Sequence, residues 1–254
     1  MMSRYALVAL FLLTRSALAQ WVESGAHNEI SPVADLIHRH IEMEEGKTGE
    51  SASLELALFS TKTLGLRLID NPDGASDLAS AAARRICLAG VNGGYFDPNF
   101  APLGLRVVDG KVVRPLLRAR LMTGVLLSAP GAIRILRVGE YTARRKALAA
   151  VQCGPLLVDG GTPVKGLDRT RTARRTFAFV AGDRAALGLC SETSLAGVAQ
   201  ILSALRLDNG AKISRALNLD GGSSSAFWFK RADGSAFTIS EMKNVRDFVG
   251  VVPR

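Results

Sequence analysis

Short apolar runs separated by glycine-containing turns place the strongest constraint on the fold of this chain. Residues 105–108 and 111–113 flank Asp109 and Gly110, a pair that favours the tight turn of a β-hairpin. Residues 156–158 run into a similar turn at 159–161. A third hairpin is expected from residues 177–180 and 185–189, around Gly182 and Asp183. We therefore expect the chain to fold mainly as antiparallel hairpins.

Helical patterns are fewer. Residues 77–85 are rich in alanine, and the segment that begins near Ser194 has apolar residues at helical spacing through Leu205. Residues 33–44 show a similar pattern. Further strands are expected at residues 54–60, 64–70, 86–91, 121–127, 133–138, 217–219 and 226–229. These elements predict an α+β fold with a mixed, largely antiparallel, hairpin-rich sheet and a few packed helices.

The N-terminus has the pattern of a secretory signal peptide at residues 1–19. Arg4 precedes an apolar run at 5–13, and Ala17 and Ala19 form the small-residue motif of a cleavage site. A buried N-terminal helix is the alternative. The run is too short to span a bilayer, and no second long apolar stretch follows, so we expect no membrane span after the signal is removed. The expected location is therefore the periplasm or the extracellular space.

The remaining chain is divided into a polar N-terminal lead-in segment at residues 20–51 and one main domain at residues 52–254. The net charge of +9 falls to +7 when Arg4 and Arg15 leave with the signal peptide. Such a charge suits an anionic envelope polymer or a phosphate-bearing substrate, and it is also common as general surface charge. Nucleic acid is the least expected partner, because the sequence has no basic motif interleaved with aromatic residues.

The three cysteines, Cys87, Cys153 and Cys190, lie far apart in apolar surroundings and are expected in the core. An oxidising compartment would allow one pair to form a disulfide. We expect Cys153 and Cys190 to be that pair if one forms, because both fall in segments predicted as neighbouring strands.

All three histidines lie in the lead-in segment, so the main domain has no imidazole for a Ser/His/Asp triad or a zinc site. His38 and His40 are two residues apart, which on a helix would direct them to different faces and favours solvent exposure over metal binding. Catalysis in the main domain is therefore expected to use carboxylates, hydroxyls, amides or arginines.

The densest group of such residues is the segment 216–225. Strand alternation places Leu217 and Leu219 on one face, with Asn218 and Asp220 on the other. Gly221 and Gly222 then allow close approach to the backbone and expose N–H groups to an anion, and Ser223 follows them. A simple turn capped by the aspartate is the alternative, but it does not account for the preceding amide.

Two other predicted strand ends repeat this design. Asn92 is followed by Gly93 and Gly94, and Gln152 is followed by Cys153 and Gly154. Each is an ordinary turn when taken alone, but together they suggest strand ends that converge on one site.

A cluster of arginines precedes one of the predicted hairpin strands. Guanidinium groups suit the bidentate recognition of phosphate, and a solvated basic loop is the alternative. The cluster comprises Arg169, Arg171, Arg174 and Arg175.

Five blocks, in this order and spacing, resemble the phosphodiester glycosidase family over roughly residues 92–251. The blocks are residues 91–97 (VNGGYFD), 102–105 (PLGL) with 109–111 (DGK), 152–157 (QCGPLL), 175–176 (RT) and 217–224 (LNLDGGSS). Three positions depart from the family pattern. Arg174 stands where proline is common, no acid lies near Gly197, and Ser223 replaces a frequent third glycine.

The resemblance implies an exported hydrolase that cleaves a sugar-1-phosphodiester or a related glycosidic linkage of an envelope or extracellular glycoconjugate. It implies that Asp220 is the catalytic carboxylate and that Arg175, with Arg174, holds the phosphate. Asn218 completes the expected catalytic group. The residues expected to bind substrate are Asn92, Gly93, Gly94, Gln152, Gly154, Arg174, Thr176, Gly221, Gly222 and Ser223.

Two other functions are consistent with the same residues. A metal-dependent phosphodiesterase would bind Ca²⁺ or Mg²⁺ through Asp220, Asp97 and backbone carbonyls. For the glycosidase, in contrast, the sequence predicts no specific cofactor. A non-catalytic module for envelope polysaccharides would need exposed aromatic residues, and few lie near the motifs. Glu192 and Asp97 are the candidates for a second catalytic carboxylate. The sugar, its aglycone, the stereochemical outcome and the oligomeric state stay open.

Overall fold

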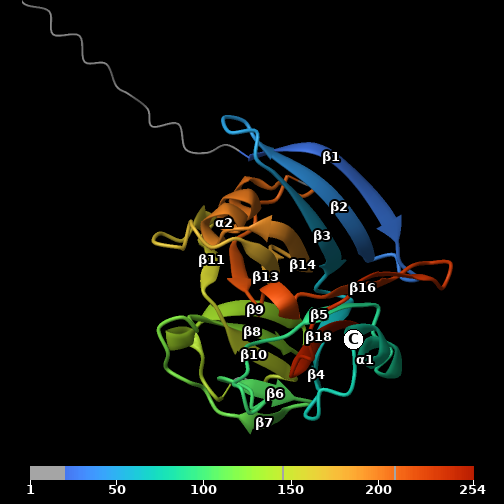
Figure 1. The fold of residues 1–254 in the computed structure, drawn as a ribbon. Coiled ribbons are helices and arrows are strands. Elements are labelled where there is room, and N and C mark those ends of the chain that lie inside the picture. The colour runs from blue at the N-terminus through green and yellow to red at the C-terminus, as the bar shows by residue number, and fades with distance from the viewer. Residues whose placement is uncertain (1–20, 145, 209) are drawn as a thin grey trace, which may run out of the picture.

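The structure is a computed structural model that describes residues 21–144, 146–208 and 210–254, and its strands form three β-sheets (Figure 1). Every strand pair in these residues is antiparallel. Two short α-helices, α1 (Leu78–Arg84) and α2 (Leu195–Ala204), complete the fold. The expected hairpin-rich, mainly antiparallel architecture is therefore confirmed. The predicted signal peptide at residues 1–19 lies outside the described residues.

The first sheet has eight strands in the order β1-β2-β3-β14-β13-β15-β11-β12. Its strands are β1 (Trp21–Ile30), β2 (Leu36–Glu45), β3 (Ser51–Ser60), β11 (Leu156–Asp159), β12 (Thr162–Pro163), β13 (Ala173–Ala181), β14 (Arg184–Thr193) and β15 (Arg215–Asn218). β13 and β14 form the hairpin expected around Gly182 and Asp183. β15 lies between β13 and β11, so the segment that follows it starts from the interior of the sheet.

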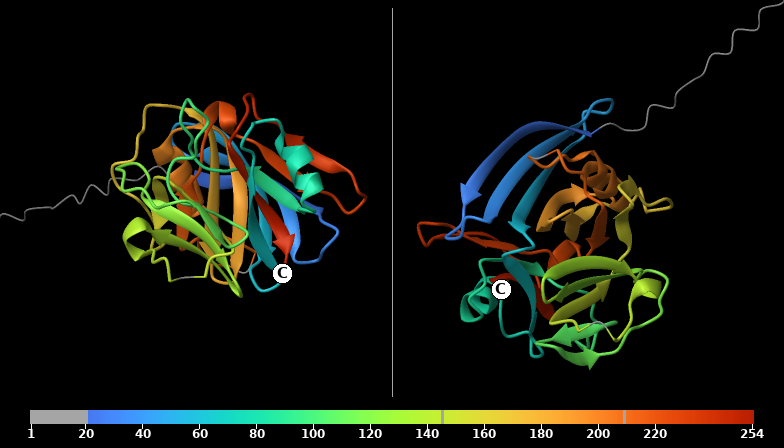
Figure 2. Two further views of the ribbon diagram at one scale, coloured as in Figure 1. Left: turned by 90° about the horizontal axis from the view of Figure 1, so that it is seen from below. Right: turned by 180° about the vertical axis from the view of Figure 1, so that it is seen from behind.

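The other two sheets have five strands each. The second sheet has the order β7-β6-β10-β8-β9, from β6 (Arg106–Val108), β7 (Lys111–Arg114), β8 (Gly124–Ala129), β9 (Ala132–Arg137) and β10 (Ala149–Cys153). The third has the order β17-β16-β5-β18-β4, from β4 (Leu64–Asp70), β5 (Ala89–Asn92), β16 (Phe227–Lys230), β17 (Ala236–Ile239) and β18 (Asp247–Pro253). β1, β2 and β3 lie at one end of the molecule and β6 and β7 at the other (Figures 1 and 2).

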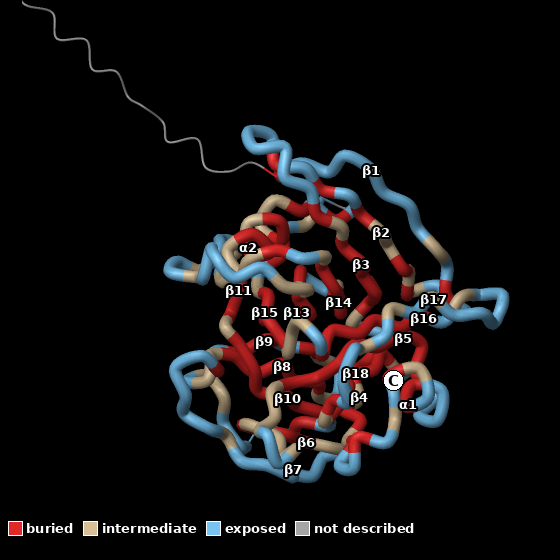
Figure 3. Tube along the Cα trace, viewed as in Figure 1, coloured by how far each residue is buried: buried red, intermediate tan, exposed pale blue. Residues whose placement is uncertain are grey.

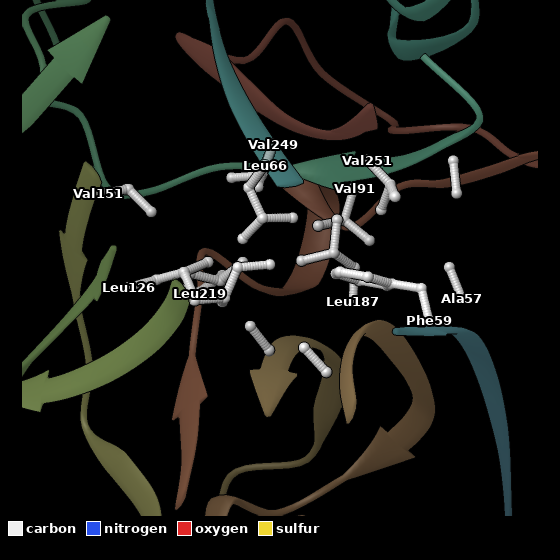
Figure 4. Packing of buried hydrophobic residues seen from close by; sticks show 14 of the residues in the cluster. Ala57, Phe59, Leu66, Val91, Leu126, Val151, Leu187, Leu219, Val249 and Val251 are labelled. Atoms are coloured by element: carbon white, nitrogen blue, oxygen red, sulfur yellow. The ribbon is translucent and has the colours of Figure 1, made fainter. Parts of the chain in front are cut away.

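The main hydrophobic core lies where the three sheets meet (Figure 4). Leu66 and Val91 enter it from the third sheet, Val151 from the second, and Phe59 and Leu187 from the first. Because each sheet contributes one apolar face, removal of these faces from water holds the three sheets together. The strand ends above this core are thereby fixed relative to one another.

The predicted late helix is confirmed. α2 begins after Ser194, whose side chain accepts a 3.0 Å hydrogen bond from the N–H of Gly197. Val198 and Leu202 lie on its buried face, in a second apolar cluster with Phe177 of the first sheet. α1 is confirmed in the same way, with Asp77 as its N-cap. No helix in the described part of the chain is long and apolar enough to cross a bilayer.

The helix expected at residues 33–44 is wrong, because residues 36–45 form β2. The spacing of Val33, Ile37 and Ile41 suggested a helix, but β2 pairs with β3 along its whole length, and pairing with a buried strand overrides local spacing. The segment before it, for which only a polar lead-in was predicted, forms β1, which pairs with β2. Both strands extend the first sheet.

The expected disulfide between Cys153 and Cys190 is also wrong, because all three cysteines are free and buried. Cys153 lies in β10 of the second sheet and Cys190 in β14 of the first, so they are not on neighbouring strands. Burial raises the pKa of each of these two thiols to about 12, which is the behaviour of a small core side chain.

Candidate active site

The segment after β15 forms a compact turn around Asp220. Leu217 and Leu219 enter the core, as strand alternation predicts. The half-buried carboxylate of Asp220 accepts a 3.0 Å hydrogen bond from the N–H of Gly221 and a 2.6 Å bond from the hydroxyl of Ser224. Gly222–Ser224 is a 3₁₀ turn, in which the N–H groups of Ser224 and Ser225 donate to the carbonyls of Gly221 and Gly222, at 3.3 and 3.1 Å.

The pKa of Asp220 is raised above its usual value because burial disfavours the charged carboxylate, and the negative charge of Asp247 adds to this effect. The hydrogen bond from Ser224 and the positive charge of Lys243 act in the opposite direction. Asp220 is therefore a carboxylate whose proton affinity is set by burial and tuned by two close neighbours. Such a balance is common among acids and bases in active sites.

Asn92 joins three strand ends at this turn. Its amide nitrogen donates a 2.7 Å hydrogen bond to the carbonyl of Asp220, and its amide oxygen accepts bonds from the hydroxyl of Thr176 at 2.7 Å and the N–H of Ala226 at 3.0 Å. Asn92 and Thr176 are fully buried. The structure thus brings the expected strand ends together, and it uses these two side chains to position the turn.

Asn218 is also buried, and it faces a different partner. Its amide nitrogen donates to the carbonyls of Gly154 and Leu219, at 3.0 and 2.7 Å, and lies 3.1 Å from the hydroxyl of Tyr95. Tyr95 itself donates a 2.6 Å bond to Gly154. The amide oxygen of Asn218 is buried without a hydrogen-bond partner in the described residues. An unpaired buried acceptor of this kind calls for a donor that the described residues do not supply.

A buried ion pair explains the two glycines that follow Asn92. Arg106 and Asp247 lie 2.7 Å apart and are each 1% exposed. A Cβ atom at Gly93 would lie 1.8 Å from the Asp247 carboxylate, and one at Gly94 would lie 2.3 Å from the Arg106 guanidinium. The N–H of Gly94 donates to Asp247 at 2.8 Å. These glycines therefore serve close packing against the ion pair.

Gln152 has all of its hydrogen-bonding groups in use. Its amide oxygen accepts bonds from the N–H groups of Leu105 and Leu117, and its nitrogen donates to the carbonyls of Leu117 and Met122. The side chain is fully buried. Gln152 thus holds the loop at residues 115–123 against β10, and it offers no free group to a substrate.

Two arginines of β13 flank the turn. A Cβ atom at Gly221 would lie 2.9 Å from the carbonyl of Arg174 and 4.0 Å from Cδ of Arg175, so both residues lie against this glycine. Arg175 donates to the carbonyls of Thr193 and Arg171, at 2.9 and 2.5 Å. One guanidinium nitrogen of Arg174 is buried and has no hydrogen-bond partner among the residues that the structure describes. Neither arginine forms an ion pair within the described residues.

Burial lowers the pKa of Arg175 from its usual high value, since a desolvated cation without a carboxylate partner is disfavoured. Lys243 adds a third positive charge. It acts on Asp220 and lies with its ammonium 5.0 Å from the centre of the Phe96 ring. Nothing in the local sequence around Lys243 indicated this position, because the lysine reaches the turn only through tertiary contacts such as the 2.8 Å bond from Met242 N–H to the Ser223 carbonyl.

The two candidates for a second carboxylate are placed differently. Asp97 accepts bonds from the N–H groups of Asn99 and Ala101, so it stabilises its own loop. Glu192 is exposed on β14. Sequence reasoning missed Glu241, and burial raises the pKa of its carboxyl group. One of its oxygens accepts a 3.0 Å hydrogen bond from the N–H of Leu78, and the other is buried without a partner in the described residues.

The histidines of the N-terminal strands contact carboxylates. His38 lies 2.7 Å from Glu55 and 3.0 Å from Glu29, and His40 lies 2.8 Å from Glu55. In the described ranges, no group of three or more His, Cys, Asp or Glu residues is arranged to hold a metal ion. Arg169 and Arg171 are exposed in the loop before β13.

Comparison with known proteins identifies the family of the sequence and solved structures of similar fold. The sequence matches the phosphodiester glycosidase family over residues 86–252. The fold is similar to the zebrafish N-acetylglucosamine-1-phosphodiester alpha-N-acetylglucosaminidase catalytic domain auto-inhibited by pro-peptide. The TM-score is 0.66 at 16% identity, covering 92% of this chain and 89% of that one.

A hypothetical protein from Synechocystis is similar as well, with a TM-score of 0.60 and 16% identity over 87% of this chain and 62% of that chain. No curated protein sequence matches. Since the family match spans more than half of the sequence, the chain belongs to the phosphodiester glycosidase family.

Proposed function

We propose that this protein is an exported hydrolase that cleaves the bond between the anomeric carbon of a sugar and a phosphodiester. The periplasm or the extracellular space is its proposed location, on the basis of residues 1–19. The zebrafish relative is named for action on an N-acetylglucosamine-1-phosphodiester. For the present protein we propose only that the same class of bond is cleaved, and not that the sugar is the same.

The observation that carries the proposal is the pair of arginines beside Asp220 that lack an acidic partner. Most other arginines that contact the body of the protein, such as Arg106, Arg215 and Arg231, are paired with carboxylates. Arg174 and Arg175 are instead held by carbonyls or left unpaired. A desolvated guanidinium needs an anion, and the diester phosphate supplies one of suitable geometry.

The second part of the proposal concerns the role of Asp220 toward the sugar. We assign it as the base or nucleophile at the anomeric carbon, since its carboxylate is half-buried and fixed by Gly221 and Ser224. A phosphate monoester is a good leaving group and needs little protonation. Its departing charge would be stabilised by Arg174 and Arg175. Because the arginines stabilise the leaving group, this mechanism requires no second catalytic carboxylate beside Asp220.

The substrate-facing set is smaller than the sequence suggested. Asn92, Thr176 and Gln152 are fully buried and occupied, so we assign them to positioning. The proposed contacts are made by residues that are partly or fully exposed, together with Arg175, which is 8% exposed. The exposed or partly exposed residues are Asp220, Arg174, Gly221, Gly222, Ser223 and Lys243. Asn218 is assigned to shaping the floor of the site beneath Asp220, where its free oxygen can accept a bond from a sugar hydroxyl or a water.

The test is turnover of a panel of sugar-1-phosphodiesters, with products identified by mass. We expect release of the free sugar and a phosphate monoester. Asp220→Asn should lower kcat by about 10³-fold or more. Asp97→Asn is the matched control and should retain activity, because that side chain only stabilises its own loop. Unchanged turnover in Asp220→Asn would contradict the assignment, and sugar binding without turnover of any substrate would favour a binding module.

A further inference from the structure

A basic and apolar surface lies on the second sheet, at the end of the molecule that carries β7 (Figures 1 and 3). We call it the basic-apolar surface, and it comprises β7, the loop at residues 115–121, residue 144 and residues 146–148. β7 is an edge strand, and all four of its residues are exposed. Leu148 joins the surface because its carbonyl accepts a 2.8 Å bond from the N–H of Gly110 in the β6–β7 turn.

Large aliphatic side chains are exposed here in unusual number. Nine large hydrophobic residues are strongly exposed in the described parts of the chain, and five of them belong to this surface. Their exposed fractions run from 41% to 66%. They are Val112, Val113, Leu117, Leu121 and Leu148. Clustered exposed aliphatics of this kind mark an interaction site more often than an ordinary surface.

The charge of the same region is mainly positive, and Asp109 in the β6–β7 turn is paired with Arg67 at 3.6 Å. Nine basic residues and a single acid, Glu140, lie between Asp109 and Asp159 in the sequence. Glu140 is already bound to Arg215 at 2.6 Å. Exposed basic residues of the surface form no ion pair within the described residues: Lys111, Arg114, Arg118, Arg120, Arg144 and Lys146. Apart from the arginines at the start of β13, most buried or partly buried arginines in the described residues form ion pairs with carboxylates.

We propose that this surface docks the protein on an anionic lipid bilayer. Aliphatic side chains interleaved with unpaired basic ones match the interface, where the aliphatics enter the acyl boundary and the cations meet the lipid phosphates. Charge complementarity alone would also allow a soluble polyanion, but a polyanion gives no reason for five exposed aliphatics. Single-stranded nucleic acids stack their bases on aromatic side chains, whereas the exposed hydrophobic residues of this surface are aliphatic.

The loop is built to present these side chains. Gln152 binds both the N–H and the carbonyl of Leu117 from beneath, which fixes the backbone of the loop while its side chains face outward. A cavity of about 640 Å³ adjoins the loop, with Arg118 and Arg120 on its wall and Met122 and Leu156 in its lining. This hollow gives a lipid headgroup access to both guanidinium groups at the edge of the surface.

The experiment is co-sedimentation of the full chain with phosphatidylcholine vesicles, with and without about one third phosphatidylglycerol. We expect binding to the anionic vesicles and weak binding to the neutral ones. Raising the salt to about 0.5 M should reduce binding, because it screens exposed charges. Every variant carries the same N-terminus, so differences between variants report on the basic-apolar surface.

Arg118→Ala with Arg120→Ala should weaken partitioning about tenfold or more, and Val113→Ser with Leu121→Ser should do the same through lost insertion. Arg118→Lys with Arg120→Lys should retain binding. The matched controls, Lys212→Ala with Lys230→Ala and Val22→Ser with Ile30→Ser, remove equal charge or apolar area elsewhere and should bind like the parent. Circular dichroism and the melting temperature establish that each variant is folded.

Equal binding to neutral and anionic vesicles would overturn the proposal, as would no binding to either. Equal losses in the control variants would also overturn it. Binding to soluble polyphosphate with none to anionic vesicles would assign the surface to a polyanion instead. Loss in the arginine variant with none in the Val113 and Leu121 variant would contradict insertion into the bilayer.

Discussion

Arg106 Nε lies 2.7 Å from Asp247 Oδ2 in the interior, and the two residues are 141 positions apart in the sequence. The pair joins the second sheet to the third directly behind the glycines that follow Asn92. The other guanidinium nitrogens of Arg106 donate hydrogen bonds to the carbonyls of Tyr95, Leu103 and Gln152. The pair therefore fixes the strand ends on which the site depends.

The first prediction concerns this pair. Arg106→Leu should lower the free energy of unfolding by about 3–5 kcal/mol, because it leaves the Asp247 carboxylate buried without its partner. Urea unfolding measures the change. Arg134→Leu removes an exposed arginine of the same sheet and should have little effect. A loss below about 1 kcal/mol in Arg106→Leu would contradict the structural role assigned to the pair.

The second prediction concerns the pH dependence of activity. Ser224 donates a bond to the Asp220 carboxylate and thereby opposes the rise in its pKa that burial produces. The proposed mechanism needs the ionised carboxylate, so activity should fall as the pH decreases through the pKa of Asp220. Ser224→Ala should move this acidic limb to higher pH, whereas the exposed Ser223→Ala should leave it in place. A pH–rate profile of kcat/KM measures both, and an unshifted limb in Ser224→Ala would argue against Asp220 as the titrating group.

The third prediction concerns phosphate recognition. Arg174→Met should lower kcat/KM for a sugar-1-phosphodiester by about 10- to 100-fold, because the guanidinium is assigned to the diester phosphate. The free energy of unfolding of this variant should change little, since one guanidinium nitrogen of Arg174 is buried without a partner in the described residues. Arg169→Met removes the same charge from the exposed loop and serves as the control. Equal effects of the two substitutions would reduce the role of Arg174 to general electrostatics.

The fourth prediction concerns stability in acid. Hydrogen bonds from Arg231, both 2.9 Å long, lower the pKa of Glu29 from 4.5 to about 2. The carboxylate is depressed in the folded state, so its contribution is present above pH 4.5 and is lost as the pH falls toward 2. Arg231→Ala should weaken that acid dependence and lower the free energy of unfolding at neutral pH, while the contact of Glu29 with His38 remains. Unfolding free energies measured across this range test it, with Lys212→Ala as the control, and an unaltered pH profile would contradict it.

The hairpins and both helices were predictable because their signals are local. Asp109 with Gly110 and the Ser194 cap specify a turn and a helix start through their own backbone chemistry. The segment around Asp220 could be found for the same reason, since a strand that ends in a carboxylate and two glycines is visible in the sequence.

Other features depend on contacts between distant segments. β2 is a strand because β3 pairs with it, whatever its own spacing suggests. The glycines after Asn92 looked like anion donors, and only the Arg106–Asp247 pair shows why no side chain fits there. Lys243 could not be found from sequence, because its effect on Asp220 depends on the contact between the segment after β17 and the turn after β15.

In the proposed mechanism Asp220 directs attack at the anomeric carbon rather than at phosphorus. Hydrolysis of a sugar-1-phosphodiester in water enriched in heavy oxygen tests it directly, with the phosphate monoester product analysed by mass. The proposed mechanism predicts a monoester without the label, because the bond between carbon and oxygen breaks, and it predicts that Asp220→Asn abolishes product formation. Label in the monoester would contradict the mechanism and would indicate a phosphodiesterase that attacks phosphorus.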